Sequence, residues 1–429
     1  MKKNRAYQSV RVNKVDWNRT NRFEEQQAVH VGVDIGKFEL MSVLRWPDGS
    51  FERPWQAKNP GEIGSLVDLL FRVHESHQLT VALEPTGTYG DAVRQALDDA
   101  GLCVHRVSPK ASHDYAEIFD GVPSQHDGKD AAVIAELSAL GKSGSWRYES
   151  PSLIDQEMSY WVDWMDAHRR QKAMWVGRLE SLLARHWPEA TRLLKLSSST
   201  LLRVLEHYGG PAALGNDDEA ITQVKTWGGP RLTLSKVGQF VWEAQASMGV
   251  RQGTIDVQRM QQYAKQARAA DNEIKTSQQR LKRLAKGNRV LEAQGAAIGI
   301  PTACVLWVHL GDPSNYHCGS AYRKAMGLNL KERSSGTWKG RLTISKRGSA
   351  QIRNWLFFAA LRLIRGQPVK EWYDLKKAKD NDGATRALVG VMRRLAMALY
   401  QIGACGQSFD AGKLFPGDQL VHENNIQGR

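Results

Sequence analysis

The chain of 429 residues has little cysteine and no long apolar run. Its four cysteines, Cys103, Cys304, Cys318 and Cys405, lie far apart and form no C-x-x-C pair. This spacing excludes a zinc ribbon and a disulfide framework, and it is typical of a reducing compartment. No stretch is apolar enough to span a bilayer, and the basic N-terminus lacks the apolar segment of a secretory signal. We therefore expect a cytoplasmic protein with no membrane partner.

Acidic residues are also in short supply, with 45 Asp and Glu against 59 Lys and Arg, so the net charge is +14. The 41% apolar and 24% charged content is that of a globular protein, and the length allows two or three domains. An excess of positive charge favours a polyanionic partner, of which nucleic acid is the commonest. The alternative is a merely basic soluble protein. We expect association with the nucleoid.

The stretch Val29–Lys37 predicts a strand that ends in a carboxylate. Valines at every second position from 29 to 33 alternate with other residues, which is the period of a strand with one buried face. Asp34 falls at the end of this strand, where it can leave the core. Gly32 lets another backbone or a phosphate approach closely. Because an aspartate that closes a strand is more often a turn former, Asp34 alone does not define a site.

The following pattern consists of strands and then of alternating strands and helices. The predicted elements are strands over 38–45 and 51–56, a helix over 61–77, a strand over 79–84, a helix over 88–100, a strand over 102–107 and a helix over 129–140. Three antiparallel strands followed by alternating α/β units are the order of a ribonuclease H-like fold. We therefore predict an α/β fold for this part of the chain.

Four acidic residues fall where such a fold presents them. Glu84 ends a strand as Asp34 does, and Asp127 and Asp130 are three residues apart on one helix face. Converging carboxylates repel one another unless divalent cations lie between them. Two Mg²⁺ or Mn²⁺ ions about 4 Å apart clamp the attacking and leaving oxygens of a phosphodiester. Three cationic residues nearby are expected to be solvated surface charges rather than phosphate contacts: Arg106, His126 and Lys129.

Residues 151–290 predict long helices. Leu153–Trp187 and Thr254–Lys286 have helical patterns, and Pro188 ends the first because a helix cannot easily continue through proline. In the second, two series recur every seven residues as a and d positions of a short coiled coil: Met260, Ala267, Ile274 and Leu281, and Tyr263, Ala270, Ser277 and Leu284. We predict a homo-oligomer, a dimer or tetramer, that forms through this seam.

The region from residue 291 is basic and mostly helical. Predicted helices over 352–363 and 384–402 form its core, and the tail from Asp410 is polar and expected to fray. Cationic residues gather around one polar stretch, namely Lys331, Arg333, Lys339, Arg341, Lys346 and Arg347. That stretch, Ser334-Ser335-Gly336, would by itself be a polar turn.

Three segments carry a family resemblance: Asp34-Ile35-Gly36-Lys37, Glu84-Pro85-Thr86-Gly87-Thr88-Tyr89 and Asp127-Gly128-Lys129-Asp130-Ala131. Their order resembles the D…E-x-T-G-x-Y…D-x-x-D-A series of the DEDD insertion-sequence transposases, which are related to Piv-type DNA invertases. Gly128-Lys129 departs from the apolar or arginine residues usual there. The resemblance implies a RuvC-like N-terminal domain whose catalytic metal ligands are Asp34, Glu84, Asp127 and Asp130.

The C-terminal region extends this resemblance. Ala297–Pro313 is similar to the helix-hairpin-helix-like segment of the family, and the Ser-Gly pair followed by Ser345–Gly348 is similar to its transposase domain. In that family the serine before the glycine is the nucleophile, which the spacing from Gly327 places at Ser335, with Ser334 as the alternative register. An attacking serine needs cationic stabilisation, and no histidine base lies in this motif.

The resemblance thus implies a transposase, a site-specific DNA recombinase of a mobile element, that works through a covalent phosphoserine and a noncoding bridge RNA. Composition indicates only that a polyanion is bound. Two alternatives stay open: a RuvC-like Mg²⁺-dependent nuclease or Holliday-junction resolvase, and a non-catalytic nucleic-acid-binding scaffold. The predicted organisation is a basic flexible arm (1–24), a RuvC-like DEDD domain (25–150), a helical coiled-coil oligomerisation region (151–290), a mostly α C-terminal transposase domain (291–410) and a tail (411–429).

Overall fold

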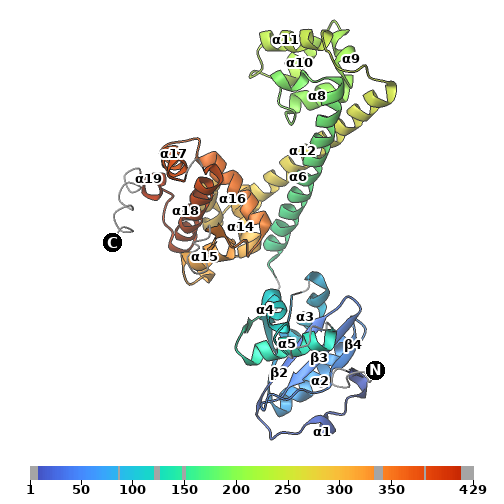
Figure 1. Ribbon diagram of the computed structural model, residues 1–429, viewed down its shortest axis with the longest axis vertical. Helices are drawn as coiled ribbons and strands as arrows, with labels where there is room; N and C mark the ends of the chain where they lie inside the picture. The colour runs from blue at the N-terminus through green and yellow to red at the C-terminus, as the bar shows by residue number, and fades with distance from the viewer. Residues whose placement is uncertain are drawn as a thin grey trace, which may run out of the picture. The chain divides into compact units, whose positions relative to one another are not determined.

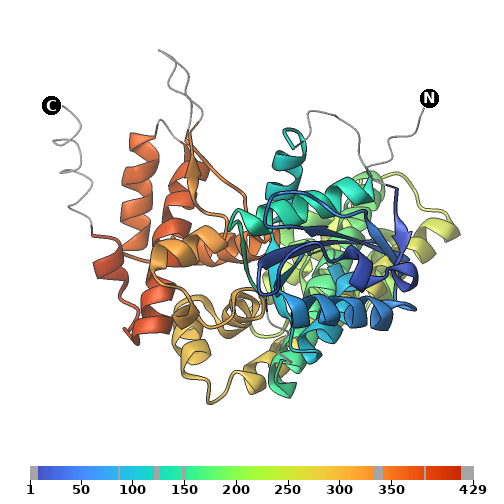
Figure 2. The same cartoon turned by 90° about the horizontal axis from the view of Figure 1, so that it is seen from below.

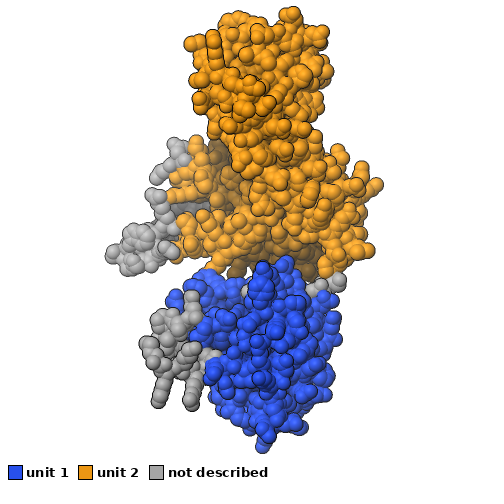
Figure 3. Space-filling view, turned by 90° about the vertical axis from the view of Figure 1, so that its right-hand side faces the viewer, with its two compact units in different colours: residues 1–150 blue, residues 151–429 orange. Residues whose placement is uncertain are grey.

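The computed structural model describes residues 8–85, 87–119, 126–146, 151–332, 342–380 and 383–416. The chain divides into two compact units, residues 1–150 and 151–429 (Figure 3). The first unit is built on a sheet, and the second is almost wholly helical (Figure 1).

In the described part of the first unit, one sheet has the strand order β1-β4-β3-β2-β5-β6-β7. Its strands are β1 (Val10–Arg11), β2 (Ala28–Ile35), β3 (Glu39–Arg45), β4 (Trp55–Lys58), β5 (Gln78–Leu83), β6 (Cys103–Val107) and β7 (Ser143–Ser145). β2, β3 and β4 form an antiparallel meander, and β5 and β6 continue the sheet parallel to β2. This is the arrangement of a ribonuclease H-like fold, so the predicted fold class is confirmed.

Helices cover both faces of the sheet (Figure 2). α2 (Ile63–Ser76) and α3 (Asp91–Asp99) pack on the face to which the β2 valines point, and α4 (Pro109–Ala116) and α5 (Asp127–Ala139) cover the other. Gly32 is buried under α5. The expectation of a single buried face for β2 is therefore wrong, because parallel strands with helical connections are covered on both sides. Three short helical turns complete the unit: η2 (Val12–Lys14), α1 (Trp17–Thr20) and η3 (Gly87–Gly90).

The segment before the sheet, residues 8–24, is packed onto the unit. β1 pairs in parallel with β4, and Val12 and Trp17 are only 3% and 5% exposed. The Trp17 ring stacks on Trp46, with the ring centroids 6.0 Å apart. The prediction of a flexible arm is wrong for these residues, because two isolated apolar side chains anchor the segment without a periodic pattern.

The second unit is organised around two long helices, α6 (Leu153–His186) and α12 (Thr254–Leu284), which lie side by side (Figure 1). The Ser152 side chain caps the start of α6 by accepting a hydrogen bond from a backbone amide of its first turn. The helix ends shortly before Pro188, which has no amide hydrogen to continue it. Both predicted helices are present.

The heptad seam of α12 is buried against α6 of the same chain. Trp175 of α6 packs on Tyr263, with ring centroids 5.3 Å apart, and Lys172 pairs with Asp271 at 2.6 Å. Most seam residues are fully or almost fully buried: Met260, Ala267, Ala270, Ser277 and Leu281. The two helices therefore form an intramolecular antiparallel hairpin. The seam is not free to join protomers as predicted, because α6 already covers it.

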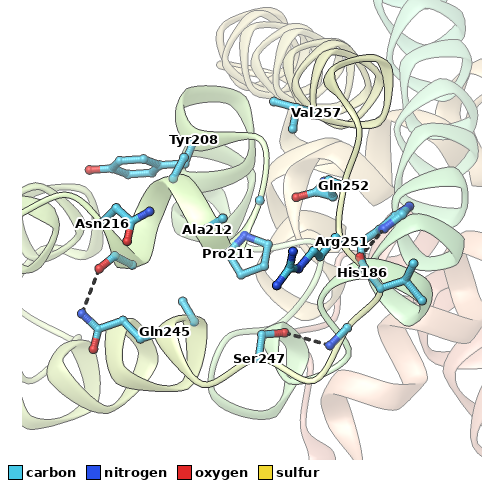
Figure 4. Close-up of a pocket in the computed structure, with 16 residues that line it drawn as sticks. His186, Tyr208, Pro211, Ala212, Asn216, Gln245, Ser247, Arg251, Gln252 and Val257 are labelled. Carbon is cyan, nitrogen blue, oxygen red and sulfur yellow. Dashed lines mark hydrogen bonds between the residues drawn. The ribbon is translucent and has the colours of Figure 1, made fainter.

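Between the long helices, the chain forms a small helical domain, the tip domain, at the far end of the hairpin (Figure 1). Its helices are α7 (Ala190–Leu193), α8 (Ser199–Tyr208), α9 (Pro211–Gly215), α10 (Ala220–Gly228) and α11 (Leu234–Gln245). Two hydrogen bonds close its neck: the Val250 amide donates to Arg185 O at 2.9 Å, and His186 Nδ1 donates to Val250 O at 2.8 Å. Figure 4 shows this neck beside a hollow of about 540 Å³ between the neck and the tip domain.

The rest of the second unit is a helical domain with one short hairpin, β8 (Leu330–Lys331) and β9 (Thr343–Ile344). Its helices are α13 (Arg289–Ile298), α14 (Ile300–Leu310), η4 (Pro313–Asn315), α15 (Gly319–Ala325), α16 (Ala350–Leu363), α17 (Val369–Lys379), α18 (Ala384–Cys405) and α19 (Ala411–Leu414). Phe415 is fully buried against Trp372, so the tail does not fray at residue 410 as expected. No helix in the described ranges is long and apolar enough to cross a membrane.

Candidate active site

Two neighbouring parallel strands bring Asp34 and Glu84 to the same edge of the sheet. In the β2–β5 register Val33 lies opposite Leu83, so the two acids are the next residues on their chains. Both side chains are partly buried. β5 ends just before Pro85, which has no amide hydrogen for a further ladder bond. The carboxyl ends of parallel strands meet at one edge, which is why strand-end acids were expected to converge.

The first turn of α5 carries the other two predicted carboxylates, of which Asp127 is exposed and Asp130 half-buried. His126 caps this helix, and its Nδ1 accepts a hydrogen bond from the Lys129 amide at 3.3 Å. Carboxylates are favoured in a first turn because the unpaired amides there give the helix end a partial positive charge. α5 packs across β2 and β3, which holds this turn beside the strand ends.

Gly32 allows α5 to lie this close to β2. A Cβ added at Gly32 would collide with the carbonyl oxygen of Ala131 and the amide nitrogen of Ala135, and would lie 3.1 Å from Ala135 Cα. All three atoms are helix backbone, which cannot move aside as a side chain can. The expected close approach to Gly32 is thus made by the α5 backbone, and it sets the distance between Asp34 and Asp130.

The other acids of the site act electrostatically on Asp34 and Asp130. Burial is the largest cause that raises the pKa of Asp34 to about 6, followed by the charges of Asp130, Asp127 and Glu84, in that order of size. Burial also raises the pKa of Asp130, and Asp127 adds to the effect. Like charges in a partly desolvated site cost free energy, which a bound cation relieves.

The donor set fits a hard divalent cation in its chemistry, because carboxylate oxygens are the ligands that Mg²⁺ and Mn²⁺ prefer. In the ranges that the structure describes, however, no three acidic, histidine or cysteine side chains lie close enough together to hold a metal ion as they stand. The pKa of Asp34 shows that the acids are within electrostatic reach of one another. The site thus has the ligands for a cation without a preassembled cage.

Lys129 differs from what its charge led us to expect. Its residue is only 2% exposed, although it was predicted to be a solvated surface charge like Arg106, which is exposed on β6. The nearby His126 and Lys129 lower the pKa of Asp130, against the effects of burial and Asp127. In the sequence, the only sign that Lys129 acts on Asp130 was its position between Asp127 and Asp130. By its sequence pattern, Lys129 could not be distinguished from an ordinary exposed lysine on a helix.

The second predicted centre lies around the β8–β9 hairpin. Ser334 and Ser335 fall outside the described residues, as do Arg333, Lys339 and Arg341. The structure describes the two ends of this stretch, where Lys331 pairs with Thr343. Lys346 has a positive φ of 55°, and its amide donates to Gly327 O at 3.2 Å.

Two glycines of this region are explained by close backbone contact. Gly327 has a φ of +73°, and a Cβ there would lie 2.7 Å from Arg347 O. Gly348 has a φ of +131°, and a Cβ there would lie 2.9 Å from Gly327 N and closer still to Ala325 O. The two backbone segments therefore cross in direct contact, which fixes the root of the hairpin.

Two models of transposase families match different parts of this chain. A family model described as Transposase, of the DEDD IS110 type, matches residues 31–188, and the model of the Transposase IS116/IS110/IS902 family matches residues 293–374. The chain carries the two domains of IS110-family transposases. The predicted family is thereby confirmed, and the transposase is an enzyme that cuts and rejoins DNA.

Individual proteins are also similar to this chain. An uncharacterized protein of insertion element IS110 from Streptomyces coelicolor is 24% identical over 402 residues, which cover 90% of this chain and 96% of that protein. The transposase for insertion sequence element IS1111A from Coxiella burnetii is 28% identical over 149 residues, 33% of this chain and 40% of that protein. Among solved structures, RuvC of Thermus thermophilus in complex with a Holliday junction substrate covers 28% of this chain and 100% of its own, with 16% identity and a TM-score of 0.23.

Proposed function

We propose that Asp34, Glu84, Asp127 and Asp130 hold Mg²⁺ or Mn²⁺ and cut DNA in the transposase reaction. The observation that carries the proposal is the placement of the acids, two at adjacent strand ends and two in the first turn of α5; with burial, the three others raise the pKa of Asp34 to about 6. A bound divalent cation supplies charge neutralisation for the oxygens of a phosphodiester. The sheet and α5 contribute the positions: two acids at adjacent strand ends and two in one helical turn.

The carboxylate proposal is tested by four single variants: Asp34→Asn, Glu84→Gln, Asp127→Asn and Asp130→Asn. Each is expected to lower strand cleavage at least about a thousandfold and to weaken Mn²⁺ binding measured by calorimetry. The matched control is Asp68→Asn, an exposed aspartate on α2 on the opposite face of the sheet. Normal cleavage and metal binding in all four variants would show that the acids are structural.

We infer further that Ser335 is the nucleophile. Its Oγ bonds to a DNA phosphorus, one phosphodiester P–O bond breaks, and the leaving sugar oxygen takes the electron pair and a proton. The hydroxyl proton of Ser335 passes to solvent. The cations around the hairpin, Lys331, Lys346 and Arg347 among them, offset the charge that builds on the phosphoryl oxygens. The covalent link retains the energy of the broken bond, so DNA is rejoined without ATP.

A denaturant-resistant protein–DNA adduct is the expected signature of this step, with mass spectrometry of nuclease-trimmed peptides to locate it. Ser335→Ala should lose the adduct and strand exchange but keep DNA binding, whereas Ser334→Ala should keep all three. An adduct on Ser334 instead would move the assignment by one residue. Cleavage to free ends with no adduct in the unaltered protein would identify a nuclease that uses the carboxylates alone.

A noncoding bridge RNA and a homo-oligomer, a dimer or tetramer, complete the proposal. The net charge of +14 supports a large polyanionic partner. Protein purified from cells that carry the intact element should bring a discrete RNA, and RNase should stop sequence-specific recombination. Light scattering of the purified complex gives its oligomeric state. Full specificity in RNA-free protein would leave DNA recognition to the protein.

A further inference from the structure

A cavity of about 580 Å³ lies where α16 meets the α6–α12 hairpin. Its lining combines three cations, one acid and two large aromatic rings: Arg169, Lys172 and Asp271 from the hairpin, and Trp355, Phe358 and Arg362 from α16. We call it the guanidinium pocket.

Arg169 is the central group of this pocket. Its guanidinium carbon lies 4.0 Å from the centroid of the Trp355 ring and 5.6 Å from that of Phe358. Its Nη1 atom is buried and has no hydrogen-bond acceptor in the part of the chain that the structure describes. Buried donors are nearly always paired in folded proteins, so this atom is a donor for which the described residues provide no acceptor.

The remaining charges leave the pocket positive. Asp271 is shared by Lys172 and Lys275, each 2.6 Å from one of its oxygens. Arg362 donates one hydrogen bond to Ile298 O at 2.8 Å and is otherwise open to solvent. Two guanidinium groups that line one cavity favour an anion, and a phosphate accepts the several hydrogen bonds that they offer.

An exposed ring stands beside these cations. Phe358 lines the pocket and is 41% exposed, although a phenylalanine in a helical domain is usually covered. A ring next to guanidinium groups is the combination with which proteins bind single-stranded nucleic acid, where the ring stacks on a base and the cation holds the phosphate.

We propose that the guanidinium pocket binds one unstacked nucleotide of a single-stranded nucleic acid, its phosphate on Arg169 and Arg362 and its base on Phe358. The cavity volume lies in the range of about 300–1,000 Å³ usual for small-molecule sites. The proposal rests on the nucleic-acid partner of the proposed function, but it requires neither the carboxylates nor Ser335. Unpaired RNA and unpaired DNA offer the same chemistry.

The test is photocrosslinking of the full-length protein to short single-stranded RNA and DNA oligonucleotides that carry 5-iodouracil, with adducts mapped by mass spectrometry. We expect an adduct on Phe358. Phe358→Ala should lower the affinity for these oligonucleotides about tenfold, because one stacked base is lost. Arg169→Gln should lower it to a similar extent. Adducts with RNA alone, with DNA alone or with both would each support the pocket and identify the strand that it takes.

The chain offers matched controls. Phe357 is 37% exposed and precedes Phe358 but does not line the pocket, and Arg170 follows Arg169 on α6 but pairs with Asp166 at 2.9 Å. Phe357→Ala and Arg170→Gln should leave affinity and crosslinking unchanged. Equal losses in Phe357→Ala and Phe358→Ala, or adducts only outside the pocket, would overturn the proposal. A protein that crosslinks as expected but does not recombine DNA would separate this result from a failure of the proposed catalytic function.

Discussion

The acidic edge of the sheet and the basic segment around β8 and β9 are held in different ways. The acidic edge joins β2, β5 and α5, whose interior side chains are almost completely buried. β8 and β9 contribute two residues each, and Leu330 and Lys331 are exposed. What fixes the basic segment is the backbone crossing of Gly327 and Gly348 at its root. Packing therefore holds the first predicted centre, whereas local backbone geometry holds the described ends of the basic segment.

The strongest test of packing control is Gly32→Val. The added side chain would collide with the α5 backbone at Ala131 and Ala135, so we expect the free energy of unfolding to fall by about 4 kcal/mol and DNA cleavage to be lost. Chemical denaturation and a plasmid cleavage assay measure both. Gly64→Ala, on α2 with open space around it, should change little. A stable, active Gly32→Val protein would show that α5 does not set the site.

The next largest expected loss of unfolding free energy is in the helical unit, residues 151–429. Leu281 is fully buried between α12 and the C-terminal helices, so Leu281→Ala should cost about 3 kcal/mol of unfolding free energy, while exposed Lys282→Ala should cost almost nothing. Because the seam lies within one chain, light scattering should find the same oligomeric state in both variants. Dissociation of the oligomer by Leu281→Ala without unfolding would reinstate the seam as a contact between protomers.

The acidic edge also predicts a pH dependence. The folded-state pKa of Asp34 is about 6, above the usual value of about 3.9, so stability should fall as pH rises from about 4 to 6 and remain reduced above that. Asp34→Asn removes this penalty. We expect it to exceed the unaltered protein in unfolding free energy by about 2 kcal/mol at pH 7 without divalent ions, and to match it below pH about 4. Denaturant titrations over this pH range measure the difference in unfolding free energy between the two proteins. A difference that does not vary with pH would show that the charge of Asp34 is not its cause.

The smallest expected effect distinguishes the backbone conformation of Lys346 from the charge of its ammonium group. Lys346 has a φ of 55°, which costs a lysine about 1 kcal/mol relative to glycine. Lys346→Gly should therefore be slightly more stable, and Lys346→Asn close to unchanged. Strand exchange should fall in both if the ammonium group matters, whereas activity retained in both would assign this position a conformational role alone. Thermal unfolding and a recombination assay give the two readouts.

The sequence was sufficient for the acidic edge because its signals are local. Alternating valines predicted β2, and strand-end positions placed Asp34 and Glu84 at one edge, as found. The sequence was insufficient where a packing partner from elsewhere in the chain determines which surface is covered. The α12 heptads predicted a seam but not that α6 covers it, since periodicity defines a face and not its occupant. Trp17 and Phe415 anchor segments through single side chains, which no periodic pattern reveals.

The closed neck of the tip domain has a consequence for how this family can diversify. The Val250 amide meets the Arg185 carbonyl, so the chain leaves the hairpin and returns to it at the same place. A domain inserted between two points that already touch can vary in length without altering the register of the helices that carry it, provided that it still covers Leu183 and Met260, which share its core. The α6–α12 hairpin therefore carries the tip domain as an insertion whose entry and exit lie side by side.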